Sequence, residues 1–131
     1  MNDLRELSEL AWKGLLDTKF EHHPVHTFYE GSTEINSFVL GIKGIGGFYA
    51  IDTGDGLVML DAGSQLDIET GYQEIKKWRP NDYLKKVIFS HHHVDHIFAV
   101  QKFDEECKEK NLPPPKVYSH SLTPEHFDRY K

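Results

Sequence analysis

The chain has 131 residues, and its 15 Lys and Arg against 21 Asp and Glu give a formal net charge of -6 with histidine neutral. This length fits one domain. The acidic balance argues against nucleic acid as a partner, because phosphate binding needs clustered Lys and Arg. No apolar run approaches the roughly 20 residues of a membrane span, and residues 1–16 do not resemble a signal peptide. With Cys107 as its single cysteine, the chain has no internal disulfide. We expect a cytoplasmic protein without a membrane partner.

The first half of the chain, residues 1–63, predicts a helix followed by a run of strands. Leucine and alanine recur at helical spacing early on, so we expect a leading helix within residues 1–20. Residues 25–63 predict antiparallel strands, because short apolar runs are separated by turn residues; these runs are 25–29, 35–42, 48–51 and 57–60. Asp55-Gly56 predicts a hairpin between the last two. Gly44, Gly46 and Gly47 indicate a flexible hairpin tip.

Residues 64–131 predict alternating helix and strand, as in a layered arrangement of sheet and helices. The apolar stripe of Ile68, Tyr72, Ile75 and Trp78 predicts a helix that Pro80 ends. A short apolar strand follows at 87–89, and the stripe of His96, Val100, Phe103 and Cys107 predicts the next helix. Cys107 is therefore expected in the core. Residues 116–119 predict a strand, and a last helix begins near Thr123.

The residues that indicate chemistry are Ser90–His96, with the sequence SHHHVDH directly after a predicted strand. In extended backbone, side chains two residues apart point the same way, so His91 and His93 can hold one cation. Asp95 and His96 lie where the chain turns into a helix, and they can hold a second cation beside the first. Imidazole nitrogen and carboxylate oxygen suit Zn²⁺, Fe²⁺ and similar ions.

The histidines also have plainer interpretations. Adjacent histidines can form a surface cluster on a loop, but a position between a strand and a helix favours a metal site. His22, His23 and His26 are better explained as a solvated loop, because no acid or cysteine stands at ligand spacing. His120 and His126 are candidates for a substitute ligand, although a polar surface role is the commoner one for such residues.

The motif resembles the metal-binding signature of the metallo-β-lactamase superfamily, His-x-His-x-Asp-His at the end of a strand. Residues 57–63, LVMLDAG, resemble the strand of that family that ends in Asp-x-Gly. Residues 117–130 resemble the alkylsulfatase-like branch more weakly. The resemblance implies an α+β fold, the αββα sandwich, of which residues 1–131 form the N-terminal half within a single domain.

The resemblance also implies roles for individual residues. His91 and His93 match ligands of a first metal ion, and Asp95 and His96 match ligands of a second. Asp95 would also orient the attacking water, and Asp61 matches an aspartate that supports the ligands from outside. The family's remaining ligands come later in its chains, beyond residue 131. A C-terminal region or a second chain is therefore the expected partner that completes the sandwich.

These observations lead to two hypotheses. The first is a metal-dependent hydrolase with two ions, zinc or else iron or manganese. Its metal-bound hydroxide would attack a small-molecule ester, thioester, lactone or sulfate ester. The alternative is a non-catalytic half-domain that binds metal weakly and assembles with a partner chain or a missing C-terminal half. Its exposed sheet face would then bind that partner.

Overall fold

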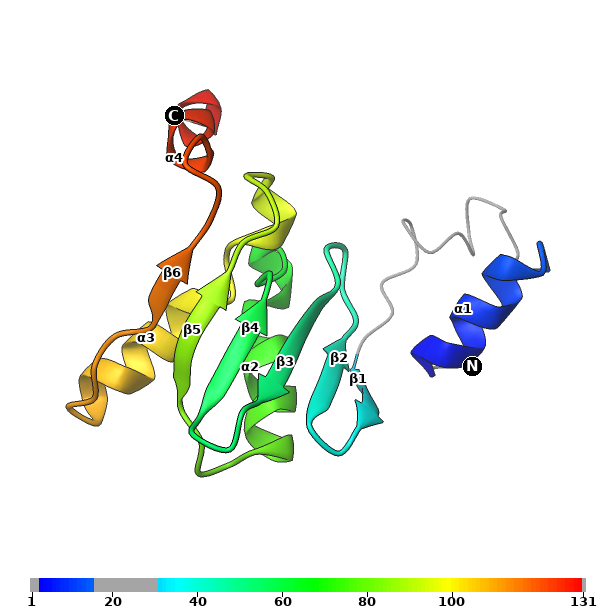
Figure 1. Cartoon of the computed structure of the whole chain (residues 1–131), viewed down its shortest axis with the longest axis horizontal. Helices are drawn as coiled ribbons and strands as arrows, with labels where there is room; N and C mark the ends of the chain where they lie inside the picture. The colour runs from blue at the N-terminus through cyan, green and yellow to red at the C-terminus, as the bar shows by residue number, and fades with distance from the viewer. Residues whose placement is uncertain (1–2, 16–30, 131) are drawn as a thin grey trace.

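The computed structural model describes residues 3–15 and 31–130, and it places two long helices behind a single mixed sheet (Figure 1). Within the described residues the six strands are β1 (Ser32–Asn36), β2 (Val39–Ile42), β3 (Phe48–Asp52), β4 (Leu57–Leu60), β5 (Leu84–Ile88) and β6 (Lys116–Tyr118). The α-helices are α1 (Leu4–Trp12), α2 (Ile68–Trp78), α3 (Val100–Glu109) and α4 (Thr123–Phe127). Three 3₁₀ turns are η1 (Gln65–Asp67), η2 (Val94–His96) and η3 (Asp128–Tyr130). No helix within the described ranges is long and apolar enough to cross a membrane.

The leading helix predicted within residues 1–20 is α1, which ends at Trp12. Asp3 caps its start, because the side chain accepts a hydrogen bond from the Arg5 backbone N–H at 2.7 Å. The Leu4 backbone N–H donates to Thr33 Oγ1 at 3.1 Å, which ties the helix start to β1. The continuation of this helix toward residue 20, and the strand predicted at 25–29, lie outside the described residues.

Strands β1 to β4 form the predicted antiparallel meander, and the hairpin predicted at Asp55-Gly56 joins β3 to β4. The prediction of one strand over 35–42 was wrong, because a turn splits this segment into the end of β1 and all of β2. The Asn36 side chain accepts from the Phe38 backbone N–H at 3.0 Å, which stabilises that turn.

The rest of the sheet is parallel. β5 pairs in parallel with β4, and β6 pairs in parallel with β5, so the sheet order follows the chain order from β1 to β6. The crossovers between these strands contain α2 and α3, which both lie behind the sheet in Figure 1. This arrangement brings the carboxyl ends of β4 and β5 side by side, where ligand sites form in such sheets.

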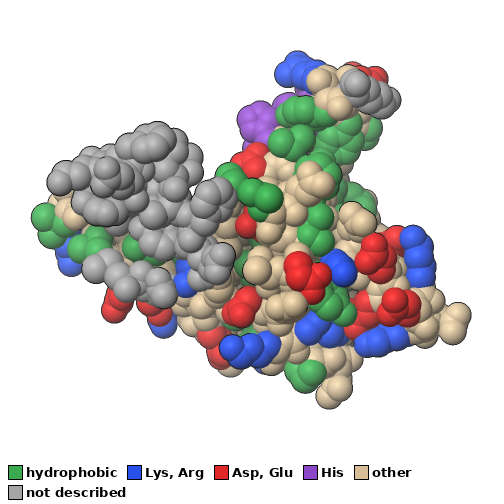
Figure 2. Space-filling view, turned by 180° about the vertical axis from the view of Figure 1, so that it is seen from behind, with side chains coloured by type: hydrophobic (Ala, Val, Ile, Leu, Met, Phe, Trp, Pro, Cys, Tyr) green, Lys and Arg blue, Asp and Glu red, His purple; other side chains and the backbone are tan. Residues whose placement is uncertain are grey.

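The core lies between the sheet and the two crossover helices. Met59, Val87, Ile75 and Phe103 are fully buried there. Gly71 lets α2 approach the sheet, because a Cβ atom at this position would lie 2.4 Å from Phe48 Cζ. The outer surfaces of these helices carry interspersed acidic and basic side chains, as the rear view shows (Figure 2).

Cys107 lies in this core, as predicted, with 1% of its surface exposed. Burial, together with the nearby Glu106 carboxylate, raises the pKa of the Cys107 thiol. The thiolate is therefore disfavoured at neutral pH, and a structural role fits this side chain better than a reactive one.

Candidate metal centre

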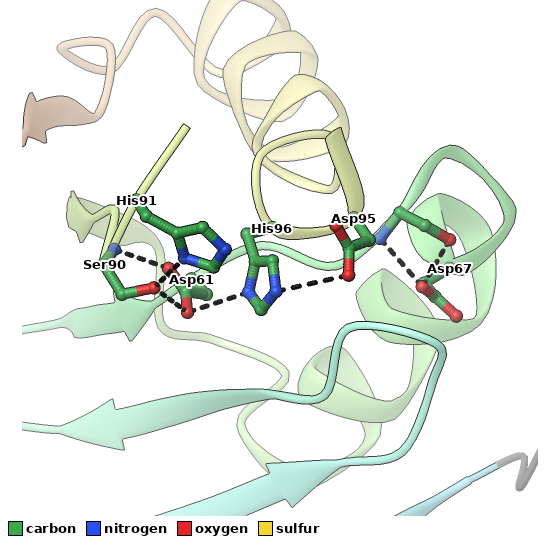
Figure 3. A network of polar contacts seen from close by, with 7 residues as sticks. Asp61, Asp67, Ser90, His91, Asp95 and His96 are labelled. Atoms are coloured by element: carbon green, nitrogen blue, oxygen red, sulfur yellow. Dashed lines mark hydrogen bonds and ion pairs between the residues drawn. The ribbon is translucent and has the colours of Figure 1, made fainter. Parts of the chain in front are cut away.

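The polar residues of the site follow the two central parallel strands. Asp61 comes directly after β4, while Ser90 and His91 come shortly after β5. The Asp61 backbone N–H donates to the Ile88 carbonyl at 2.9 Å, which extends the β4–β5 ladder to the edge of the site. Figure 3 shows Asp61, Ser90, His91 and His96 facing one another at this edge, with Asp95 on the far side of His96.

Asp61 holds two other residues of the site in place, Ser90 and His96. Its carboxylate is buried and accepts from the Ser90 backbone N–H at 2.7 Å and from the Ser90 hydroxyl at 2.7 Å. His96 Nδ1 lies 3.0 Å from Asp61 Oδ2. A buried carboxylate needs such partners, because burial without them is costly. Asp61 also has a φ of 59°, a left-handed conformation that is uncommon outside glycine and marks a position held by its surroundings.

The motif leaves β5 extended and then turns, as the spacing predicts. His93 is extended, with φ -67° and ψ 145°, and η2 follows as a single 3₁₀ turn. The His96 backbone N–H donates to the His93 carbonyl at 3.1 Å. The Ala62 backbone N–H donates to the His96 carbonyl at 2.7 Å, so the turn is fastened to the segment after β4.

The next helix begins later than its apolar stripe predicts. The stripe places His96 in the helix, but α3 starts at Val100. The backbone N–H groups of Phe98 and Ala99 donate to the carbonyls of Gly63 and Ala62, at 3.1 Å and 2.6 Å. Donors committed to the neighbouring segment cannot form helical hydrogen bonds, and this explains the delay.

Asp61, His91 and His96 form a group of three potential metal ligands. Each offers one ligand atom, and these atoms all lie within 4.8 Å of one another. Three donors around one zinc ion stand about 3.3 Å apart, so this group needs only a small closure to bind a cation. The hydroxyl of Ser90 lies 2.9 Å from His91 Nδ1, which leaves Nε2 of that ring for another partner. Two imidazoles and a carboxylate are a donor set that fits zinc.

The structure groups the predicted residues differently from the sequence in one respect. Asp61, expected to support the ligands from outside, is itself within the three-donor group. His93 is solvent-exposed, and its ring centroid lies 4.6 Å from that of His91. Asp95 Oδ2 lies 3.3 Å from His96 Nε2. Thus all the predicted site residues are neighbours, while in the described part of the chain His93 and Asp95 lie outside the tight group.

The middle histidine of the motif points elsewhere. His92 stacks on His126, with ring centroids 4.4 Å apart and an angle of 25° between the rings. This contact packs α4 against the motif loop. Figure 2 shows histidine side chains gathered beside the C-terminal end of the chain. Loss of solvation, together with the neighbouring His126, His93 and Arg129 side chains, lowers the pKa of the His92 imidazole. His126 thus has a packing partner here, and within the described residues neither it nor His120 joins the three-donor group.

Ser90 belongs to the predicted motif, but the sequence predicted no role for it in the site. Its hydroxyl lies between Asp61 and His91, with 2.7 Å to the carboxylate and 2.9 Å to the ring nitrogen. The available signal was its position between the predicted strand and the first histidine, but serine in such a place has no single meaning.

A family model for the metallo-beta-lactamase superfamily matches residues 44–131. Similar solved structures include the stereoselective inverting sec-alkylsulfatase Pisa1 from Pseudomonas sp. (TM-score 0.58, 22% identity, 80% of this chain and 18% of that one). They also include a Cronobacter sakazakii metallo-beta-lactamase with a HARLDQ motif (0.60, 14%, 80% and 38%). The subclass B3 enzyme BJP-1 of Bradyrhizobium japonicum is a third (0.53, 17%, 69% and 33%). No curated protein gives a significant match.

These matches settle the fold class. The chain spans between 18% and 38% of the length of these three structures, so its sheet with helices on one face is a partial fold. The predicted α+β class, as part of a metallo-β-lactamase sandwich, is confirmed. Because the family model matches more than half of its residues, the chain belongs to the metallo-beta-lactamase superfamily.

Proposed function

We propose that this chain supplies the metal-binding half of a metal-dependent hydrolase. The observation that carries the proposal is the convergence of Asp61, His91 and His96 at the carboxyl ends of two parallel strands. The superfamily match, with a sec-alkylsulfatase and metallo-beta-lactamases among the similar structures, supports it. We propose zinc as the metal, with iron or manganese as alternatives, because imidazole and carboxylate donors suit all three.

In this proposal each residue of the site has a distinct task. His91 and His96 bind the cation, and His93 and Asp95 complete the ligand set together with residues from the rest of the sandwich. Asp61 lies within the three-donor group, but in this proposal it acts as the outer partner of His96. Its 3.0 Å contact to Nδ1 holds the ring and orients the opposite nitrogen toward the cation. Asp95 accepts a proton or hydrogen bond from the attacking water. The bound metal would lower the pKa of that water and stabilise the developing oxyanion.

The proposed substrate is a small molecule with an electrophilic carbonyl, phosphorus or sulfur centre: an ester, thioester, lactone or sulfate ester. Because the chain spans less than two fifths of the similar structures, we propose that turnover requires a C-terminal region or a second chain. That region would bring the remaining ligands and cover the open face of the sheet.

Metal binding tests the proposal directly. Zinc and cobalt affinities should be measured by titration calorimetry for the chain and for His91→Ala, His96→Ala and His120→Ala. We expect the first two variants to lose at least tenfold in affinity, as loss of a ligand or its outer partner does. His120→Ala, which removes an exposed imidazole outside the three-donor group, should bind like the parent chain. A parent chain that binds neither metal would refute the proposed function.

Activity separates the two hypotheses that the sequence leaves open. Turnover of an ester, a thioester, a lactone and a sulfate ester should be followed for the zinc-loaded chain alone and with the region that completes the sandwich. Turnover only in the completed protein supports the hydrolase. Zinc binding without turnover in either form would favour the non-catalytic half-domain.

A further inference from the structure

The loop between β2 and β3 packs against the main chain of the metal motif. A Cβ atom at Gly46 would lie 1.8 Å from the Asp95 carbonyl oxygen and 2.7 Å from its carbonyl carbon. These distances are far inside van der Waals contact, so no side chain fits at position 46 while the turn stays in place. Gly46 does not have a left-handed φ, so it is the space at this position that requires glycine, rather than the backbone conformation.

The neighbouring glycines show that this contact is specific to one position. A Cβ atom at Gly47 would meet nothing closer than the Ile42 carbonyl oxygen at 3.4 Å, which is ordinary contact. At Gly44 it would lie 2.4 Å from the side chain of Asp67, the residue that accepts from the Ser64 backbone N–H at 2.8 Å. The glycine-rich segment, expected as a flexible hairpin tip, therefore packs on η1 with one glycine and on η2 with another.

The contact completes a set of restraints around the Asp95–His96 turn. The Ala62 backbone holds the His96 carbonyl from one side at 2.7 Å, and the 3₁₀ hydrogen bond to His93 closes the turn itself at 3.1 Å. The close approach of Gly46 restricts movement of the Asp95 carbonyl. Any displacement of this carbonyl rotates the peptide plane between Asp95 and His96. It therefore changes the orientation of the His96 ring relative to Asp61.

We propose that Gly46 is a positioning residue for the metal group, acting through the main chain of Asp95. Its lack of a side chain lets the β2–β3 loop rest on the turn and fix the His96 ring against Asp61. This inference rests on the proposed metal-binding function. It adds to the site a residue that lies far from the motif in the sequence, since Gly46 meets Asp95 only in the folded chain.

 The test compares Gly46→Ala with Gly47→Ala, which adds the same methyl group one residue further along the same loop. The readouts are zinc affinity by calorimetry, the absorption spectrum of the cobalt-loaded chain, and thermal unfolding without metal. We expect Gly46→Ala to weaken zinc binding roughly tenfold or more and to change the cobalt spectrum, as lost support of a ligand does. Gly47→Ala should leave affinity within about threefold and keep the parent spectrum, because its methyl group meets only ordinary contact.

A second variant covers the case in which Gly46→Ala does not fold. Residues 43–47 are replaced by Asn-Gly, which closes a two-residue hairpin between the paired residues Ile42 and Phe48. This change removes Gly46 from the Asp95 carbonyl, and Gly44 from Asp67, without adding a side chain at position 46. We expect the same loss of zinc affinity. Parent-like affinity and cobalt spectrum in this variant, or in a folded Gly46→Ala, would overturn the positioning role. A parent chain that binds no metal would instead refute the proposed function itself.

Discussion

At the scale of single residues, Asp61 is the most constrained position of the site. It has a left-handed backbone, a buried side chain and three polar contacts, two to Ser90 and one to His96. Aspartate and asparagine tolerate this backbone better than other side chains do. The charge and the shape of Asp61 can therefore be tested separately, with one substitution for each.

We predict that Asp61→Asn lowers zinc affinity by about 10- to 100-fold while largely preserving stability, because asparagine keeps the backbone conformation and loses the charge. Asp61→Ala should in addition lower the free energy of unfolding by about 1–3 kcal/mol, because the Ser90 backbone N–H loses its acceptor. Calorimetry and urea unfolding measure the two effects. Asp55→Asn is the control, since that side chain is 89% exposed. Equal zinc affinity in Asp61→Asn and Asp55→Asn would contradict the prediction.

At the scale of elements, an ion pair joins the two helices behind the sheet. Lys76 on α2 donates to Glu106 on α3 at 2.7 Å and to the Asp82 carbonyl at 2.7 Å. The Glu106 side chain is only 4% exposed and also accepts from Lys110. Burial acts to raise the pKa of Glu106, but the hydrogen bonds from Lys110 and Lys76 outweigh it and hold the pKa below its usual value.

We predict that Lys76→Met lowers the free energy of unfolding by roughly 2–3 kcal/mol at neutral pH, because it leaves a buried carboxylate with only Lys110. A carboxyl group whose pKa is lowered by folding stabilises the fold above its unfolded pKa and loses this effect as the pH falls. The deficit of Lys76→Met should therefore shrink below pH 4.5, the usual value for this carboxyl group. Urea unfolding at neutral pH and below pH 4.5 measures this difference in the free energy of unfolding. The control is Lys108→Met, which breaks an exposed pair with Asp104 and should lower the free energy of unfolding by less than about 1 kcal/mol. A similar loss in both variants would contradict the prediction.

The elements also show how far the sequence alone could predict the structure. Period and turn residues were sufficient for the antiparallel meander and for α2, because these depend on local contacts. The turn inside 35–42 was missed although Asn36-Ser37 offered a signal, since apolar residues continue on both sides of it. The motif's alternation placed His91 and His93 as neighbours. The close approach of Asp61 and of Gly46 could not be read from spacing, because β4 and the β2–β3 loop meet the motif only through the folded sheet.

At the scale of the whole molecule, the face of the sheet opposite α2 and α3 carries a row of exposed apolar side chains. The row crosses four strands through the pairs Tyr49–Leu60, Leu60–Ile88 and Ile88–Tyr118. These four side chains are 41%, 39%, 43% and 47% exposed. Adjacent apolar side chains on neighbouring strands form a continuous surface, and such surfaces mark binding sites or lead to association.

We predict that the chain alone associates with itself as its concentration rises, and that Leu60→Thr combined with Ile88→Thr suppresses this association. Threonine favours strands, so the sheet should persist while the apolar row is interrupted. Sedimentation velocity measures the association, and binding of a hydrophobic dye reports the exposed face. Leu66→Thr is the control, because Leu66 is 69% exposed but lies in η1, outside the row.

If a C-terminal region or a second chain covers this face, adding it should abolish dye binding to the parent chain, and the double variant should bind that region more weakly. A parent chain that stays monomeric and binds no dye would show that the row does not act as an interface.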